Sequence, residues 1–229
     1  MSMNIILLCG GKGLRLRPLT ENLPKPLAKL NGKPILHYVL NHLKDFDVKK
    51  VTVSVGYQSH KIIDYLSSQK LPWKTDISNA GDVDIISRII KVLENNNDNE
   101  EFIVLYGDTI SDVNLNTLRN FHSNHNRPIT ISTWPLKLQF GIVNIDEDSK
   151  VIDFREKPKS DIWINIGYIY FNKHIFKDLK TFETFESFLV SMSKQNKIAA
   201  YKHTGEHVTI NSLKELKEAE MYLEKREKS

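Results

Sequence analysis

Hydrophobic and polar positions in the first half of the chain follow two different periods. Continuous or alternating apolar runs predict buried strands over residues 4–9, 51–55 and 102–106. Apolar residues spaced three and four positions apart predict helices over residues 35–43, 58–68 and 84–93. Because the strands and helices alternate, the pattern predicts an α/β fold with a mainly parallel sheet covered by helices.

The second half of the chain is richer in strand patterns. Apolar runs predict strands over residues 129–134, 142–145, 151–154 and 164–171. A last helix is expected near Ser212, which forms a capping-box pattern with Glu215. The spacing of Phe182, Phe185 and Phe188 favours the core face of another helix. No proline- or serine-rich linker divides the chain, so a single domain over residues 1–229 is expected.

Composition narrows the class of protein. The 229 residues are 40% hydrophobic and 26% charged, as in a folded globular chain. The single cysteine, Cys9, excludes an internal disulfide framework and fits a reducing compartment. No apolar run approaches the ~18 residues of a membrane span. We therefore expect a cytoplasmic protein without a membrane partner.

The positive charge is concentrated in one segment. Residues 12–33 carry six basic residues against one acidic residue, Glu21, a local surplus of +5 in a chain whose net charge is +4. The remainder of the chain is therefore slightly acidic. Such a local surplus favours a small anionic ligand over a nucleic acid.

A glycine-rich loop directly follows the first predicted strand. Glycines at 10, 11 and 13 allow backbone N–H groups to approach an anion closely, and Arg15 can fork onto phosphate oxygens. The Rossmann fingerprint fails at Leu16, and the Walker A pattern fails at Leu14. Lys25 lies between two prolines, which restrict its direction. A rigid surface loop with a solvated lysine is the alternative interpretation of Lys25.

Two segments, Gly10-Gly11-Lys12-Gly13-Leu14-Arg15-Leu16 and Pro24-Lys25-Pro26, resemble the signature of the sugar-1-phosphate nucleotidyltransferases. Those enzymes join a nucleoside triphosphate to a sugar 1-phosphate and release pyrophosphate. The resemblance continues, in order, through Tyr106-Gly107-Asp108, Phe140-Gly141, Glu156-Lys157-Pro158 and Asn165-Ile166-Gly167. It is strongest to the glucose-1-phosphate cytidylyltransferase branch, through residues 106–114, 140–141 and 203–205.

The resemblance implies a Rossmann-like, mixed but mainly parallel sheet of the nucleotide-diphospho-sugar transferase (GT-A-like) type. Residues 1–125 would form the nucleotide-binding half and residues 126–229 the sugar-phosphate-binding half. The implied catalytic residues are Arg15, Lys25 and Asp108. The implied nucleotide contacts are Leu8, Gly10, Gly11, Lys12, Gly13 and Gly81, and the implied sugar-phosphate contacts are Gly141, Glu156, Lys157, Asn165 and Gly167.

A magnesium site is also implied by the resemblance, with Asp108 and Asn211 as ligands. Asp108 follows a buried strand at the carboxyl edge where α/β sheets bind ligands, although Gly-Asp is also an ordinary turn. Asn211 stands where the family has a metal-binding aspartate, and it brings a neutral oxygen without a negative charge. It could equally be only the residue before the Ser212 cap. Asp112 could assist in metal binding, but we expect it to be an acidic residue at a helix start before Asn114. We expect the eight histidines, which lack ligand spacing, to be surface or core residues.

Two functions remain open at this point. The first is Mg²⁺-dependent nucleotidyl transfer from CTP, or otherwise GTP, UTP or dTTP, to a sugar 1-phosphate for surface polysaccharide synthesis. The second is a catalytically weakened or regulatory nucleotide-binding homologue, because Asn211 replaces the expected aspartate. A nucleic-acid partner is not expected, and the sequence leaves a homo-oligomer open.

Overall fold

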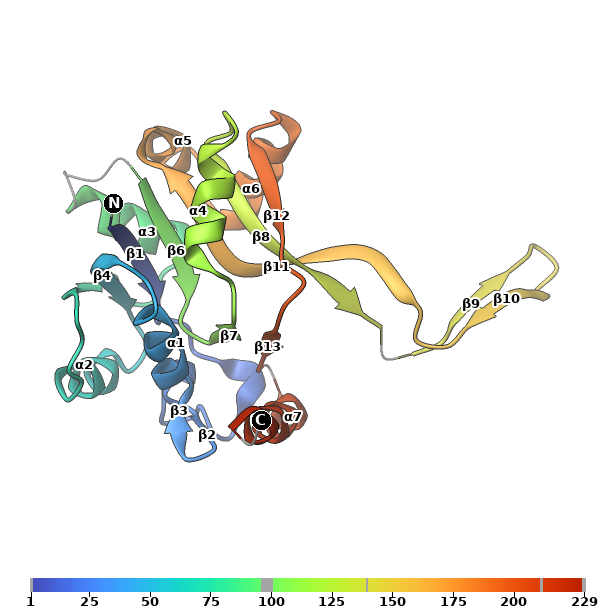
Figure 1. Cartoon of the computed structure of the whole chain (residues 1–229), viewed down its shortest axis with the longest axis horizontal. Coiled ribbons are helices and arrows are strands. Elements are labelled where there is room, and N and C mark those ends of the chain that lie inside the picture. The colour runs from blue at the N-terminus through green and yellow to red at the C-terminus, as the bar shows by residue number, and fades with distance from the viewer. Residues whose placement is uncertain (1, 96–100, 139, 211, 228–229) are drawn as a thin grey trace.

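The computed structural model describes residues 2–95, 101–138, 140–210 and 212–227 (Figure 1). Its centre is a seven-stranded sheet with the order β12-β8-β11-β6-β1-β4-β5. The strands are β1 (Met3–Leu8), β4 (Val48–Val55), β5 (Lys74–Asn79), β6 (Glu101–Tyr106), β8 (Ile129–Lys137), β11 (Lys159–Asn172) and β12 (Ile198–Lys202). Only β11 runs antiparallel to its neighbours within this sheet. The predicted mixed, mainly parallel sheet is confirmed.

Helices cover both faces of the sheet. They are α1 (Ile35–Leu43), α2 (Ser59–Ser67), α3 (Ile85–Glu94), α4 (Leu115–Ser123), α5 (Phe176–Leu179), α6 (Phe185–Lys194) and α7 (Leu213–Glu227). Phe185 and Phe188 are buried in α6, whereas Phe182 precedes that helix and reaches the Phe188 ring from the turn before it. Within the described ranges, no helix is both long and apolar enough to cross a lipid bilayer.

Alternate side chains of β1 enter two separate hydrophobic clusters. Ile5 and Leu7 pack with α1, α2 and α4. Ile6 points to the other face and packs with α3, α5 and α6. Burial on both faces explains why this strand is a continuous apolar run in the sequence.

The order of the strands creates a crevice beside β1. The chain moves outward from β1 to β4 and β5, and then returns to the opposite side of β1 with β6. Loops leave in opposite directions at such a switch point, and ligands of α/β proteins bind there at the carboxyl ends of the strands. Here those ends lead into the glycine-rich loop after Leu8 and into Gly107-Asp108 after Tyr106.

A third cluster attaches the last helix to the segment after the glycine-rich loop. Its members are Leu16, Ala28, Leu30, Ile35, Ile210, Leu216, Ala219 and Leu223. The backbone N–H of Asn31 donates to Glu220 Oε1 at 3.2 Å, and its side chain donates to the Glu220 carbonyl at 3.1 Å. The Glu215 N–H donates to Ser212 Oγ at 3.2 Å, which confirms one half of the predicted capping box.

Three small strand pairs lie outside the main sheet. They are β2 (Lys29–Leu30) with β3 (Lys33–Pro34), β7 (Thr109–Ser111) with β13 (His207–Thr209), and β9 (Ile142–Ile145) with β10 (Val151–Arg155). The β9–β10 hairpin continues from the extended ends of β8 and β11 and projects away from the body of the molecule (Figure 1). We call residues 140–158 the arm.

Candidate active site

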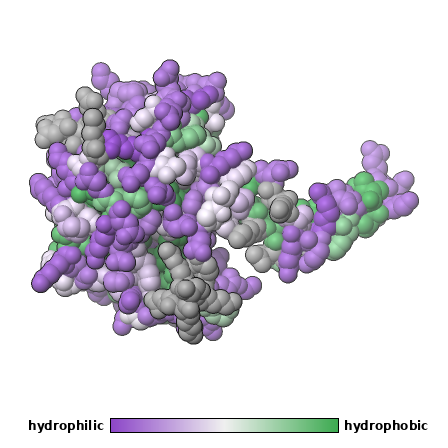
Figure 2. Space-filling model, in the orientation of Figure 1, coloured by the Kyte–Doolittle hydropathy of each residue, from purple (hydrophilic) through white to green (hydrophobic). Residues whose placement is uncertain are grey.

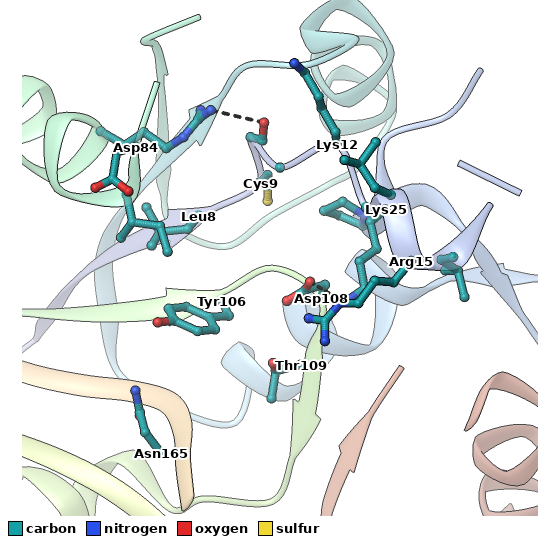
Figure 3. Close-up of a pocket in the computed structure, with 18 of the residues that line it drawn as sticks. Leu8, Cys9, Lys12, Arg15, Lys25, Asp84, Tyr106, Asp108, Thr109 and Asn165 are labelled. Atoms are coloured by element: carbon teal, nitrogen blue, oxygen red, sulfur yellow. Dashed lines mark hydrogen bonds and ion pairs between the residues drawn. The ribbon is translucent and has the colours of Figure 1, made fainter. Parts of the chain in front are cut away.

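A cavity of about 810 Å³ occupies the switch point (Figure 3). This volume falls in the usual range of small-molecule sites. The lining comprises residues 8–16, Lys25, Pro26, residues 82–85, Arg88, Tyr106, Asp108, Thr109, residues 164–166 and His207. The structure therefore brings together most of the predicted nucleotide contacts, the three predicted catalytic residues and Asn165.

The glycine-rich loop is packed directly against the Pro-Lys-Pro segment. Gly13 has φ +61°, and a Cβ added to it would lie 2.8 Å from the Cβ of Lys25. Thr20 Oγ1 donates to the Gly13 carbonyl at 2.7 Å. Only glycine combines this left-handed backbone with so close an approach, so the loop and Lys25 keep a fixed relative position.

Lys25 and Asp108 form an ion pair in this pocket. The Nζ–Oδ2 distance is 2.7 Å, and the side chains are 12% and 29% exposed. Figure 3 shows Arg15 reaching toward the same region from the loop. Asp108 can approach Lys25 because Gly107, the residue before it, packs closely on Cys9. A Cβ added to Gly107 would lie 2.4 Å from Cys9 Sγ. A cation and a carboxylate are thus held side by side at the ends of β1 and β6.

The residues present can hold a magnesium ion through Asp108. Among the described residues, no three His, Cys, Asp or Glu side chains gather as a metal cluster. Mg²⁺ keeps several waters and is commonly bound by one or two carboxylates together with substrate phosphates, so a single pocket carboxylate fits it. The other predicted ligand, Asn211, lies outside the described residues.

Arg88 connects several backbone segments around the pocket through hydrogen bonds. Its side chain is buried and donates to four carbonyl oxygens, those of Val55 at 3.1 Å, Gly10 at 3.1 Å, Gly81 at 2.9 Å and Val83 at 3.0 Å. Burial lowers the pKa of this guanidinium from its ordinary value. Gly81, a predicted nucleotide contact, lies outside the pocket lining and is held by Arg88 instead.

Sequence reasoning missed Arg88, although a signal was present. The residue lies three positions after Ile85 and four before Val92, within the apolar stripe of the predicted helix. A charge on a buried stripe must be paired or hydrogen-bonded, so it marks a structural or functional site. The start of α3 is fixed by Asp84, whose Oδ1 accepts from the Ile86 N–H at 2.8 Å.

An ion pair joins two segments that line the cavity. Lys12 of the glycine-rich loop pairs with Asp82, which precedes α3. Both side chains are exposed, at 45% and 66%, so the ion pair is weak and either residue can readily bind another charged group instead.

The remaining wall is formed by Tyr106, Thr109, Asn165 and His207. Burial is the largest cause that raises the pKa of Tyr106 to about 12, so its hydroxyl stays protonated. Asn165 Oδ1 accepts from the Gly167 N–H at 3.0 Å. Gly167 itself does not line the cavity; a Cβ there would lie 2.5 Å from the Tyr106 ring, so this glycine allows the tyrosine to pack.

His207 enters the pocket because β13 pairs with β7. Burial, followed by the charge of His203, lowers its pKa to about 4, so its imidazole is neutral at physiological pH. Its ring centroid lies 5.4 Å from that of Trp134. The expectation of surface or core histidines missed this residue, which has no sequence motif of its own.

Asp112 supports the segment that leads to His207. Its Oδ1 accepts from the Glu206 N–H at 2.6 Å and lies 2.8 Å from His203 Nε2. The prediction of Asp112 as the acid that starts a helix is therefore wrong. Asn114 is the cap of α4, and its side chain accepts from the Thr117 N–H at 3.0 Å.

Three predicted sugar-phosphate contacts lie in the arm, outside the pocket lining. A Cβ on Gly141 would lie 3.0 Å from Glu156 Oε2, so these two residues are neighbours there. Lys157 follows at the end of the arm with φ +43°. Their roles remain predictions.

Comparison with known proteins identifies the family. Residues 4–210 match the nucleotidyl transferase family. The chain is 30% identical over 243 aligned residues to a probable glucose-1-phosphate cytidylyltransferase of Bacillus subtilis (strain 168), with 94% of each chain covered. It is 32% identical over 207 residues to a D-glycero-alpha-D-manno-heptose 1-phosphate guanylyltransferase of Campylobacter jejuni, with 86% of this chain and 90% of the relative covered.

A solved structure shares the fold of this chain. The crystal structure of HddC from Yersinia pseudotuberculosis superposes with a TM-score of 0.74 at 24% identity, covering 96% of this chain and 99% of the other. The chain therefore belongs to the nucleotidyl transferase family. This confirms the resemblance to the sugar-phosphate nucleotidyltransferases and the expectation of an enzyme.

Proposed function

We propose that the chain transfers a nucleotidyl group from a nucleoside triphosphate to a sugar 1-phosphate, giving a nucleotide sugar and pyrophosphate. The observation that carries the proposal is the Lys25–Asp108 contact of 2.7 Å beside the glycine-rich loop. Both substrates are anions, so the site must neutralise their repulsion and hold them in line. A lysine supplies positive charge for that task, and the carboxylate beside it can hold a divalent cation that supplies more.

Different residues of the pocket have different roles in the proposed reaction. An oxygen of the sugar phosphate attacks the α-phosphorus, the bond to the β-phosphate breaks, and pyrophosphate leaves with the electron pair. The attacking phosphate is already ionised, so no general base is required. Arg15 and Lys25 stabilise the negative charge that grows on the phosphates, and the loop N–H groups orient the triphosphate.

Magnesium is the proposed cofactor, held by Asp108. When bound, it would neutralise charge on the phosphate oxygens as a Lewis acid. Lys25 balances the Asp108 carboxylate before substrates bind and is then available to a phosphate. For Lys25 to exchange Asp108 for a phosphate, its side chain must lie close to the carboxylate and still be partly exposed, as it is here.

The names of two relatives guide the choice of base and acceptor. CTP is our first candidate, supported by the name of the Bacillus subtilis relative, and GTP is the next, supported by that of the Campylobacter jejuni relative. Those names also point to different acceptors, glucose 1-phosphate and a heptose 1-phosphate. Tyr106, Thr109, Asn165 and His207 offer neutral polar groups for sugar hydroxyls. We further propose that the chain acts in the cytoplasm and that its product serves surface polysaccharide synthesis.

A weakened or regulatory homologue is the second candidate, favoured by Asn211 in the place of an expected aspartate. It predicts tight nucleotide binding with no turnover. In that case Asn211→Asp should create activity, because it restores the missing negative charge.

The test is pyrophosphate release across a panel of CTP, GTP, UTP and dTTP with several sugar 1-phosphates, with and without Mg²⁺. Asp108→Asn should lower kcat by about 10²-fold or more while the circular dichroism spectrum is unchanged. The matched control is Asp64→Asn, an exposed carboxylate on α2. Turnover by Asp108→Asn equal to that of the control would refute the assignment.

A further inference from the structure

The segment that leads into Lys25 is held from outside the pocket. It covers residues 18–24, and two of its residues, Glu21 and Asn22, are exposed. Figure 2 shows that the body of the molecule has a mainly hydrophilic surface in this view, so apolar burial fixes few of the residues there. The position of these two exposed residues therefore depends on hydrogen bonds to their backbone.

Two such hydrogen bonds come from the start of α2. The Tyr57 hydroxyl donates to the Glu21 carbonyl at 2.5 Å. The Lys61 ammonium, in the first turn of the helix, donates to the next carbonyl along, that of Asn22. A hydrogen bond from a charged donor is stronger than one between neutral groups. We call Tyr57 and Lys61 the clamp, since their side chains hold two adjacent carbonyls of one segment.

Tyr57 also binds the glycine-rich loop. Its backbone N–H donates to the Gly10 carbonyl at 3.2 Å. The residue before it, Gly56, has no room for a side chain, because a Cβ there would lie 2.4 Å from the Gly81 carbonyl oxygen. The turn from β4 into α2 is therefore closely packed, and through Tyr57 it connects the glycine-rich loop with the segment before Lys25.

Only two residues separate the clamped carbonyls from Lys25. Leu23 packs against the hydrophobic core, and Pro24 has a φ of −66°, which its ring fixes. Because little rotational freedom remains between Asn22 and Lys25, a displacement at the clamp also displaces the lysine. Lys25 Nζ lies 2.7 Å from Asp108 Oδ2 in the pocket (Figure 3), whereas neither residue of the clamp is part of the pocket lining.

We propose that Tyr57 and Lys61 are positioning residues for nucleotidyl transfer, which hold Lys25 at the place where the phosphates react. The inference rests on the proposed function, in which Lys25 stabilises the negative charge that grows on the phosphates. A charge that is displaced from its place stabilises the transition state less, so the clamp supports the rate of the reaction more than the binding of the substrates.

The first test removes one donor at a time. Tyr57→Phe deletes only the hydroxyl, and Lys61→Met deletes only the charged end of the side chain. We expect kcat to fall about five- to tenfold in each variant while KM for both substrates stays within about twofold, as the net loss of one hydrogen bond allows. Circular dichroism and the melting temperature check that both variants fold.

Two further variants serve as controls. Lys61→Arg should keep nearly the kcat of the wild type, because a guanidinium can also donate to the Asn22 carbonyl. Tyr65→Phe removes a hydroxyl from the same helix and should leave kcat unchanged. A kcat of Tyr57→Phe and Lys61→Met equal to that of Tyr65→Phe, or a loss confined to KM, would overturn the proposal.

A double-mutant cycle tests whether the clamp acts through Lys25. Lys25→Met should lower kcat strongly. Tyr57→Phe added to Lys25→Met should cause no further loss, because the group that Tyr57 positions is absent. If the separate losses in kcat multiply in the double variant, Tyr57 acts independently of Lys25 and the proposal is wrong.

Chemical labelling of Lys25 tests the clamp without turnover. In the wild type the Lys25 side chain is 12% exposed, so acetic anhydride should modify it slowly relative to the exposed Lys29. Tyr57→Phe and Lys61→Met should raise this ratio of rates, measured by mass spectrometry, about threefold or more, because the segment opens locally. Tyr65→Phe should leave it unchanged.

The labelling separates the two proposals. A wild type that releases no pyrophosphate with any pair of substrates would refute the proposed function, and the reactivity of Lys25 would still decide whether the clamp holds this lysine. Equal labelling ratios in Tyr57→Phe, Lys61→Met and the wild type would overturn the clamp, whatever the activity of the wild type.

Discussion

Gly13 and Lys25 are packed so closely that an alanine at position 13 would place its Cβ 2.8 Å from that of the lysine. The glycine-rich loop and the pocket lysine therefore form one rigid unit. The lysine in turn contacts Asp108, at the end of the neighbouring strand β6. A side chain at position 13 should affect Asp108 through this chain of contacts.

Gly13→Ala should lower both stability and activity. The left-handed backbone costs about 1–2 kcal/mol for alanine, and the contact with Lys25 displaces the lysine as well. We expect kcat/KM to fall by at least about tenfold, since a 1.4 kcal/mol change is tenfold. Gly32→Ala is the matched control, because its φ is also positive, at +76°, but nothing lies within 4 Å of an added Cβ. Equal kcat/KM values in the two variants would contradict the packing argument.

Arg88→Met should damage the nucleotide side of the pocket. Four carbonyl oxygens lose the guanidinium donor, although those of Gly10 and Val55 keep backbone N–H donors from Tyr57 and Ala80. A buried polar group left unsatisfied costs about 1–3 kcal/mol, so the partly exposed Gly81 and Val83 carbonyls should cost less than that each. We expect a lower melting temperature and a raised KM for the nucleoside triphosphate, measured at a temperature where the variant is folded. Arg127→Met is the control, since that exposed guanidinium donates to one carbonyl, that of Asn196. Arg88→Lys should recover only part of the loss, because an ammonium lacks the planar fork.

His207 should make the fold less stable in acid. In the unfolded chain it binds a proton near its ordinary pKa of 6.5, and in the folded chain only near 4. Between these values the unfolded state holds more protons, so stability falls as the pH is lowered through that window. The loss approaches about 3 kcal/mol.

His207→Gln should remove this part of the acid sensitivity. Urea titrations at several pH values would measure it as the difference between the two proteins, in which the contributions of His122 and His125, whose pKa values are also lowered, cancel. Parallel stability curves for wild type and variant between pH 7 and about pH 4 would show that His207 is not held neutral.

The buried strands were the most predictable part of the fold. A strand covered on both faces is apolar throughout, and β1 and β6 were recognised for that reason. β5 was missed because its residues are mostly polar or partly exposed at the edge of the sheet. β12, at the other edge, is a mixed run of alanine and polar residues with no clear period.

The site was predictable where it lies next to a strand end. The glycine-rich loop and Asp108 both follow buried strands, so sequence order alone places them at one edge of the sheet. His207 reaches the pocket through the pairing of β13 with β7, which are distant in sequence, and no local pattern records that contact. Arg88 did leave a local signal, a charge within the apolar stripe of a helix. The arm strands β9 and β10 were recognised as short apolar runs, yet only the three-dimensional structure separates them from the body.

The cluster that joins Leu16 to Leu216 has a consequence for synthesis of the protein. Leu16 leaves the ribosome long before the helix that covers it, because α7 begins only at Leu213. The segment beside the glycine-rich loop therefore stays incompletely packed while the rest of the sheet forms. Contacts between distant parts of a chain also form slowly. Competence to bind a nucleotide should thus appear only after α7 has been translated.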